Sequence, residues 1–290
     1  MGSAPRVSDS SDVRLHAPRF GASALAIRLP GPQDVRMDLQ LAGTVAVVGG
    51  ASRGLGLACA RALAREGARV ALVARDAAAL REAAAALQRE GGTAQAFPCD
   101  LLDRAAVAAL PAAVRAGLGS PDVLVLNAAV TAPFARAERV DAETFERTVL
   151  GNVRLAHAFV TGFLPDVAAR RRGRIVAVGS LAAELGGAGQ LAYATGKAAL
   201  GGFIRTLAVE LGPQGVTANL VLPGAVDTER LAAALSAEAR AAILRRTALG
   251  RLATPEEVAA LVVFLCGAQA AYVTGATLPV TGGYELNERL

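Results

Sequence analysis

Several residue types that build functional sites are scarce in this 290-residue chain. It has no tryptophan, aromatic residues make up 4%, and the basic residues are scattered. Neither base stacking nor a phosphate-tracking stripe is supported, so a nucleic-acid partner is not expected. Two histidines and three cysteines without CxxC spacing (Cys59, Cys99, Cys266) argue against a metal site or a disulfide framework, which predicts a reducing, cytoplasmic setting. No apolar run approaches the ~18 residues that cross a bilayer, so no membrane partner is predicted.

Lysine is the scarcest charged residue. The chain has 30 Lys and Arg residues, and Lys197, in QLAYATGKAAL at 190–200, is the only lysine among them. A compact ammonium and a wide guanidinium fork are not interchangeable in a tight polar site, which indicates that this position needs what arginine cannot supply. Chance retention is the alternative. Tyr193 precedes Lys197 by four residues, which on a helix places both side chains on one face, about 5–6 Å apart at Cβ.

The pattern along the chain predicts one folded domain after an N-terminal extension. Residues 1–36 carry no sustained period and are predicted to be mostly disordered, with a targeting peptide or an upstream translation start as alternatives. From Thr44, apolar runs alternate with Ala-rich helical stretches. The candidate strands are 44–49, 69–74, 93–98, 122–127, 174–180, 216–222 and 276–280. Residues 37–290 are therefore predicted to form a single α/β domain, Rossmann-like, with a doubly wound seven-stranded parallel sheet and helices on both faces.

The first strand runs into GGASRGLG at 49–56 and then a helical stretch. Glycines allow a sharp turn and close approach to a pyrophosphate, and the helix N-terminus offers it free N–H groups. The second strand ends at Ala74-Arg75, without the acid that would bind a ribose 2′-hydroxyl. Arg75 and Arg53 can instead contact a 2′-phosphate, which favours NADPH/NADP+. The alternative is that Arg75 faces solvent.

Further motifs complete a resemblance to the short-chain dehydrogenase/reductase family, of the 3-oxoacyl-[acyl-carrier-protein] reductase type, over about residues 38–286. They are Gly50, Gly54 and Gly56, Asn127-Ala128, Asn152, Ser180, Tyr193, Lys197, Pro223-Gly224 and Thr228. The resemblance implies a catalytic set of Asn152, Ser180, Tyr193 and Lys197. It implies a cofactor site made of Gly50, Ser52, Arg53, Gly54, Leu55, Gly56, Arg75, Asp100, Leu101, Asn127, Ala128, Tyr193, Lys197, Pro223, Gly224, Val226 and Thr228. Asp100 follows the third strand and could bind the adenine amino group or cap a helix.

These residues suit carbonyl reduction. The ammonium of Lys197 favours the ionised form of a nearby phenol and can bind ribose hydroxyls. Tyr193 would give its proton to a carbonyl oxygen as hydride reaches the carbon, while Ser180 donates a hydrogen bond to that oxygen. The resemblance implies that Asn152 holds a water that reconnects Lys197 to solvent. It also implies that the three-residue gap between Tyr and Lys suits ketones rather than enoyl groups.

The substrate is less well defined by the sequence. Residues 229–249 are predicted to form a helical lid, whose Leu231, Leu235, Ile243 and Leu244 indicate a partly apolar substrate or a core-facing stripe. The run RRRGR at 170–174 could engage an acidic carrier protein or be a solvated face, and Gln214 stands where carrier-using relatives often have arginine. The first hypothesis is reduction of a β-ketoacyl substrate carried on an acyl carrier protein. The alternative is a reductase or dehydrogenase of a free polyketide, sugar or steroid-like alcohol, and a third hypothesis is a non-catalytic NADP(H) sensor. A homotetramer, or a dimer, is implied by the resemblance.

Some positions depart from the family pattern. Gly49 stands where the family usually has a threonine, and Gly196 replaces the more usual small polar residue before Lys197. Leu126 and Ala129 flank Asn127-Ala128 where asparagine and glycine are commoner. None of these removes a catalytic functional group.

Overall fold

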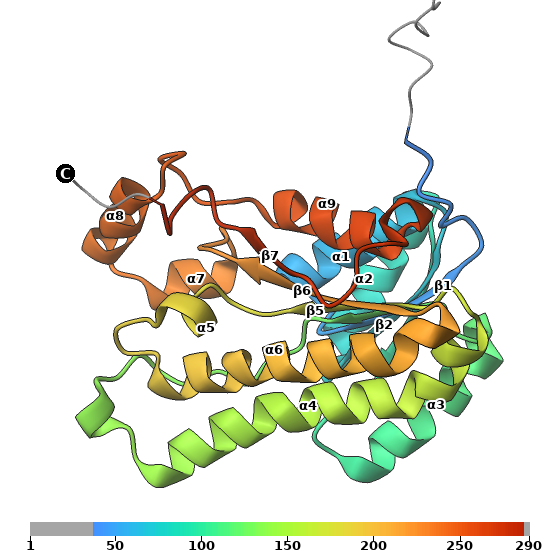
Figure 1. Ribbon diagram of the computed structural model, residues 1–290, viewed down its shortest axis with the longest axis horizontal. Helices are drawn as coiled ribbons and strands as arrows, with labels where there is room; N and C mark the ends of the chain where they lie inside the picture. Colours follow the sequence, from blue (N-terminus) through green and yellow to red (C-terminus); the bar gives the residue numbers. More distant parts are fainter. Residues whose placement is uncertain (1–36, 287–290) are drawn as a thin grey trace, which may run out of the picture. The chain divides into compact units, whose positions relative to one another are not determined.

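The computed structural model describes residues 37–286, and the folded domain begins at Leu39. All seven predicted strands are present, with ends shifted by at most two residues. They are β1 (Val45–Gly49), β2 (Arg69–Ala74), β3 (Thr93–Pro98), β4 (Val123–Leu126), β5 (Arg174–Val178), β6 (Thr217–Pro223) and β7 (Thr277–Val280). They form one parallel sheet in the order β3-β2-β1-β4-β5-β6-β7 (Figure 1). Because every strand runs the same way, the loops that follow them gather at one edge.

The chain reverses its winding direction at β1, which pairs with β2 on one side and β4 on the other. Gly49 is in register with both Val73 and Leu126, so the loops after β1 and β4 leave the sheet next to each other. The Asn127 side chain donates a hydrogen bond to the Gly50 carbonyl at 3.2 Å and ties these loops together. Ligands of doubly wound folds bind at such a switch point.

Helices cover both faces of the sheet. The helices are α1 (Gly54–Arg65), α2 (Ala77–Arg89), α3 (Arg104–Leu118), α4 (Ala142–Ala169), α5 (Ala182–Leu185), α6 (Leu191–Leu211), α7 (Glu229–Ala234), α8 (Ala237–Arg246) and α9 (Pro255–Cys266), with 3-10 turns η1 (Ala137–Arg139), η2 (Gly212–Gln214) and η3 (Ala268–Ala270). Figure 1 shows α1, α2 and α9 on one face and α3, α4 and α6 on the other. Two buried clusters result, one around Leu63 and Val262 and one around Phe159 and Ile204.

Side-chain caps set where several helices begin. Asp76, Asp103 and Asp141 accept hydrogen bonds from the first free N–H groups of α2, α3 and α4. Thr254 and Glu257 form a reciprocal capping box at the start of α9. Each cap satisfies donors that a helix N-terminus otherwise leaves unpaired, so each helix starts at a defined point after its strand.

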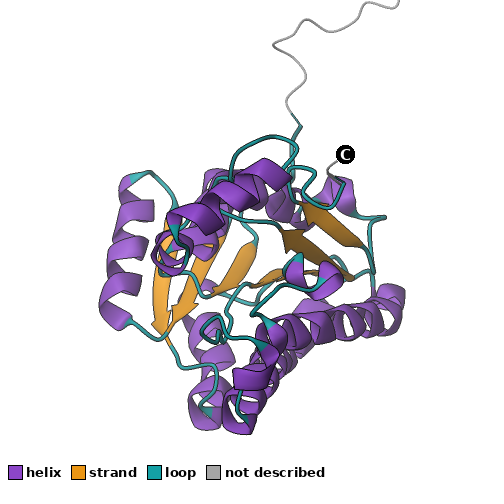
Figure 2. Cartoon of the chain, turned by 90° about the vertical axis from the view of Figure 1, so that its left-hand side faces the viewer, coloured by secondary structure: helices purple, strands orange, loops and turns teal. Residues whose placement is uncertain are grey.

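The segment predicted as a lid, 229–249, consists of α7 and α8, and neither helix contains a buried residue. Leu231, Leu235, Ile243 and Leu244 are half-buried. Figure 2 looks at the fold from the end where α5, α7 and α8 lie in Figure 1. The predicted disorder of residues 1–36 concerns a segment outside the described residues. Within residues 37–286, no helix is both long enough and apolar enough to span a bilayer.

Candidate active site

The Gly-rich turn after β1 forms a cradle that side chains would close. Gly50 has φ +73, and a Cβ there would stand 3.0 Å from the backbone of Ala128. A Cβ on Gly56 would stand 2.1 Å from the Gly50 carbonyl oxygen, so only glycine lets α1 pack this closely. Arg53 precedes α1 without a side-chain cap, which leaves the first N–H groups of the helix free for a ligand. The turn thus fits the pyrophosphate of a dinucleotide.

The residues predicted to meet the adenosine half follow β2 and β3. Arg75 is exposed directly after β2, and the carboxylate of the next residue, Asp76, is occupied in capping α2. Asp100 is also exposed, and its Oδ1 accepts a hydrogen bond from the N–H of Leu102 at 3.0 Å. The N-cap of α3 is Asp103, so the helix-cap alternative for Asp100 is wrong. Leu101, between them in sequence, is buried.

Tyr193 and Lys197 both lie on α6, as their spacing predicts. Lys197 is 2% exposed, and its Nζ donates a hydrogen bond of 2.8 Å to the carbonyl of Val178, the last residue of β5. Ser180 follows two residues later, and its Oγ accepts from the N–H of Ala182 at 3.3 Å. One helix and the end of one strand therefore bring the ammonium and the hydroxyl to the carboxyl edge of the sheet.

Burial changes the acidity of that ammonium. Removal from water, and then the nearby positive charge of Arg230, lower the pKa of Lys197 from 10.5 to about 8. Both causes disfavour the charged form. The ammonium therefore loses its proton near pH 8 rather than near pH 10.5.

The side chain of Asn152, on α4, is held by backbone groups. Its Nδ2 donates to the carbonyls of Val130 and Thr148, both at 2.8 Å, and its Oδ1 accepts from the N–H of Val130 at 3.3 Å. A Cβ on Gly196 would stand 3.2 Å from Nδ2, so α6 passes very close to Asn152. Both Nδ2 donors are used internally. A water bound to this side chain would have to donate to Oδ1.

The remaining predicted cofactor residues lie after β6 and in the first turn. The Gly224 N–H donates to Val280, and Val226 forms a bridge with Ala253, so the chain after Pro223 follows the sheet edge. Thr228 caps α7, and its methyl lies 3.7 Å from where a Cβ on Gly54 would stand. Ser52 and Leu55 are partly buried in the Gly-rich turn. The segment after β6 therefore meets the turn after β1.

Sequence reasoning missed the groups that hold the side chains predicted to be catalytic. Val178, Val130 and Thr148 act through backbone carbonyls, which no side-chain pattern reveals. Gly151 has a visible signal, because a glycine beside Asn152 inside a helix invites a packing reason. A Cβ there would stand 2.7 Å from the Val130 side chain. Arg230 was also missed.

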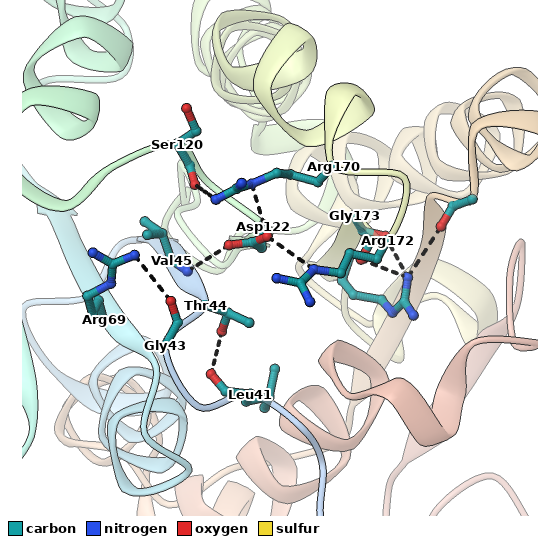
Figure 3. Close-up of polar contacts among 12 residues, drawn as sticks. Leu41, Gly43, Thr44, Val45, Arg69, Ser120, Asp122, Arg170, Arg172 and Gly173 are labelled. Carbon is teal, nitrogen blue, oxygen red and sulfur yellow. Dashed lines mark hydrogen bonds and ion pairs between the residues drawn. The ribbon is translucent and has the colours of Figure 1, made fainter.

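The arginine run at 170–174 lies at the opposite edge. Arg174 begins β5, and Asp122 directly precedes β4, so both mark the amino ends of strands. Figure 3 shows the Nε atoms of Arg170 and Arg172 directed at buried Asp122, at 3.1 and 3.6 Å. Arg174 is 6% exposed and donates to backbone carbonyls, among them Gly173 at 2.9 Å. Three of the four arginines thus make contacts within the fold, while the side chains of Arg170 and Arg172 stay 37% and 65% exposed, so a carrier-docking role of this run stays a prediction.

Comparisons with known proteins agree with this arrangement. The family profile described as Enoyl-(Acyl carrier protein) reductase matches residues 50–285. FabG of Pseudomonas aeruginosa, a 3-oxoacyl-[acyl-carrier-protein] reductase, is 39% identical over 245 residues, which cover 84% of this chain and 98% of the relative. The short-chain reductase protein NovJ of Streptomyces niveus is 40% identical over 248 residues, covering 83% and 93%.

A solved structure shares the fold closely. The crystal structure described as an NAD(P) dependent gluconate 5-dehydrogenase from Beutenbergia cavernae, with NADP bound at low occupancy, is 36% identical. It superposes with a TM-score of 0.81 over 86% of this chain and 99% of that one. The chain therefore belongs to the short-chain dehydrogenase/reductase family. It is an oxidoreductase that works with a nicotinamide cofactor.

Proposed function

We propose that this protein uses NADPH to reduce a ketone reversibly to a secondary alcohol. The observation that carries the proposal is the buried Lys197, anchored to the end of β5, with Tyr193 one turn earlier on the same helix. An ammonium in a buried site without a carboxylate partner is costly, so such a group is retained where a ligand or reaction needs it. The curated 3-oxoacyl-[acyl-carrier-protein] reductases support the same chemistry.

The four catalytic residues divide the work of the reaction. A nicotinamide cofactor bound along the Gly-rich turn supplies the hydride. Tyr193 gives its phenolic proton to the carbonyl oxygen, and Ser180 donates a hydrogen bond to that oxygen as negative charge develops. Lys197 favours the phenolate that remains and binds ribose hydroxyls. Asn152, fixed by Val130 and Thr148, offers its free Oδ1 lone pair to a water that returns the proton from solvent.

The preference for NADPH over NADH rests on the end of β2. Ala74 has no carboxylate that could bind a free ribose, and the carboxylate of Asp76 accepts hydrogen bonds at the N-terminus of α2. Exposed Arg75, with Arg53 across the turn, is available to a 2′-phosphate. Ala74→Asp combined with Arg75→Ala should reverse the preference in kcat/KM. Equal kcat/KM for both cofactors in the unmodified protein would overturn this part.

Two substrate classes are supported by different observations. The FabG relatives support a β-ketoacyl group on an acyl carrier protein. The engagement of Arg170, Arg172 and Arg174 within the fold favours a free ketone, such as a polyketide, sugar or steroid-like compound. NADPH oxidation should be measured with a β-ketoacyl carrier protein, the matching small thioester and a panel of free ketones. Turnover of none of them would favour the non-catalytic sensor.

A homotetramer, or a dimer, also stays a prediction. Helices α4 and α6 pack side by side and expose apolar side chains at Leu150, Val153 and Val209, the last 77% exposed. Tyr272, between α9 and β7, is fully exposed. Such apolar surface favours contact with further copies. Sedimentation of the purified protein tests this, and a monomer at assay concentrations would refute it.

A further inference from the structure

One arginine of the lid region lacks an internal role. Between residues 224 and 252, Arg240 pairs with Asp227 at 3.4 Å, and Arg251 pairs with Glu257 at 2.6 Å. Arg246 lies over the ring of Tyr284, 4.4 Å from its centroid, and Arg245 has a contact of its own. Arg230 makes no hydrogen bond or ion pair with any residue from 37 to 286.

The position of Arg230 in the fold indicates why it has no internal partner. It lies in the first turn of α7, two residues after Thr228, whose methyl approaches the Gly-rich turn at Gly54. Helix α7 lies with α5 and α8 at the left in Figure 1, beyond the carboxyl ends of the strands. Its charge also reaches the buried ammonium of Lys197. An exposed guanidinium without a carboxylate partner among residues 37–286 therefore lies close enough to Lys197 for its charge to act on that ammonium.

Two cations at one site repel each other, and an anion between or beside them relieves that repulsion. Arg230 cannot neutralise itself by losing a proton, and its planar fork matches a carboxylate or phosphate in bidentate fashion. Asp227 is paired with Arg240, and Glu229, next to Arg230 in the first turn of α7, forms no ion pair with it. A ligand that carries an anion would supply the missing partner.

We propose that Arg230 binds an oxyanion carried by the substrate, so that this site takes ketones with a carboxylate or phosphate close to the carbonyl group. The inference rests on the proposed ketone reduction and specifies its substrate class. Lys197 and Tyr193 remain the groups that meet the carbonyl oxygen and the cofactor. Arg230 orients the substrate from the lid side, so its loss should act on KM more than on kcat.

The test compares oxo acids with their methyl esters, and oxo phosphates with their neutral alcohols, over a range of spacings between ketone and anion. The unmodified protein should prefer an acid or phosphate over its neutral partner by about tenfold or more in kcat/KM. Arg230→Gln should abolish that preference, mainly through KM of the anionic substrates, and Arg230→Lys should restore part of it. Arg240→Gln is the matched control on the lid and should keep the preference. The pair that responds identifies the oxyanion.

Two results would overturn the proposal. One is an unmodified protein that reduces ketones without favouring any anionic member. The other is an Arg230→Gln variant that weakens NADPH binding, measured by fluorescence titration, but keeps the preference, because the arginine would then serve the cofactor. If no ketone is reduced, the proposed function fails by itself. In that case, calorimetry should measure how the oxo acids bind to the unmodified protein and to Arg230→Gln, each with NADP+. Loss of binding in Arg230→Gln supports the role of Arg230, and equal binding to both proteins refutes it.

Discussion

Helix α6 and the helices of the predicted lid, α7 and α8, are built in opposite ways. Helix α6 runs from Leu191 to Leu211, with buried positions along its whole length, and it holds Lys197 through a hydrogen bond to β5. Helices α7 and α8 are short and contain no buried residue, and Arg240 of α8 pairs with Asp227 in the loop before α7. Rigid packing suits groups whose spacing sets the chemistry. Weakly packed elements suit groups that must adjust to a substrate.

The largest effect is expected from removing the proton donor on α6. Tyr193→Phe keeps the ring but removes the phenol, so kcat should fall on the order of 10⁴-fold. NADPH affinity should stay within about threefold of normal, because the ring still packs on the half-buried surface. Stopped-flow kinetics and a fluorescence titration measure the two quantities. A loss of NADPH binding as large as the loss of turnover would contradict the assignment of a chemical role.

Lys197→Arg tests whether a charge alone is sufficient at the buried position. The guanidinium is wider than the ammonium and brings five donors to a pocket that offers one carbonyl, so kcat should fall about 10³-fold and NADPH should bind more weakly. The double variant with Tyr193→Phe should lose much less than the product of the single losses, since both act as one unit. Near-normal turnover of Lys197→Arg would mean that the chain's only lysine is an accident of composition.

The same lysine should make stability depend on pH. Its pKa in the folded chain, about 8, lies below the ordinary 10.5, so the unfolded chain binds more protons between these pH values and stability rises with pH there. Below about pH 8 both states are charged, and the full cost of burial, on the order of 3 kcal/mol, is present. Lys197→Met should therefore raise the free energy of unfolding at pH 7.

The measurement is denaturant unfolding of the unmodified protein and Lys197→Met from pH 7 to about pH 10.5, without cofactor. The difference between the two matters, because other groups also titrate: burial raises the pKa of the Cys59 thiol to about 12, which lowers stability as pH rises above 9 in both proteins. The gap between them should close as pH rises. A constant gap would show that the ammonium is not destabilised by burial.

The sheet and the side chains of the candidate site are visible in the sequence for one physical reason, and the groups that support those side chains are hidden for another. The strands are apolar on both faces, and Tyr193, Lys197 and the Gly-rich turn are side-chain patterns at fixed spacing, which are visible in the sequence. The groups that accept hydrogen bonds from Lys197 and Asn152 are backbone carbonyls, which every residue carries. The contacts of the arginine run were hidden for a related reason: a row of charges does not show which edge of the sheet it reaches or whether a buried acid such as Asp122 binds it.

A moderate effect is expected where α6 approaches α4. A methyl group at Gly196 would stand 3.2 Å from Asn152 Nδ2 and 3.3 Å from the Thr148 carbonyl oxygen, so Gly196→Ala should displace the amide and lower kcat about tenfold. Gly202→Ala is the matched control, because nothing lies within 4 Å of its Cβ position on the same helix. That variant should keep its activity and gain up to about 1 kcal/mol of stability from helix propensity. Equal activity in both variants would remove the positioning role of Gly196.

The smallest effect is expected on the lid. Arg246, at the end of α8, lies over Tyr284, and this contact joins α8 to the chain after β7. An exposed cation–π contact is worth about 0.5–1 kcal/mol, so Arg246→Ala should change the global unfolding free energy by less than about 1 kcal/mol. Because α8 has no buried residue, even that loss is a large share of the free energy that keeps α8 folded against the domain. The amide hydrogens of α8 should therefore exchange faster, while those of α6 should not. Arg81→Ala, an exposed position on α2, should leave both helices unchanged. Faster exchange in α6 as well would mean that lid and catalytic helix open as one unit, and the contrast between them would be lost.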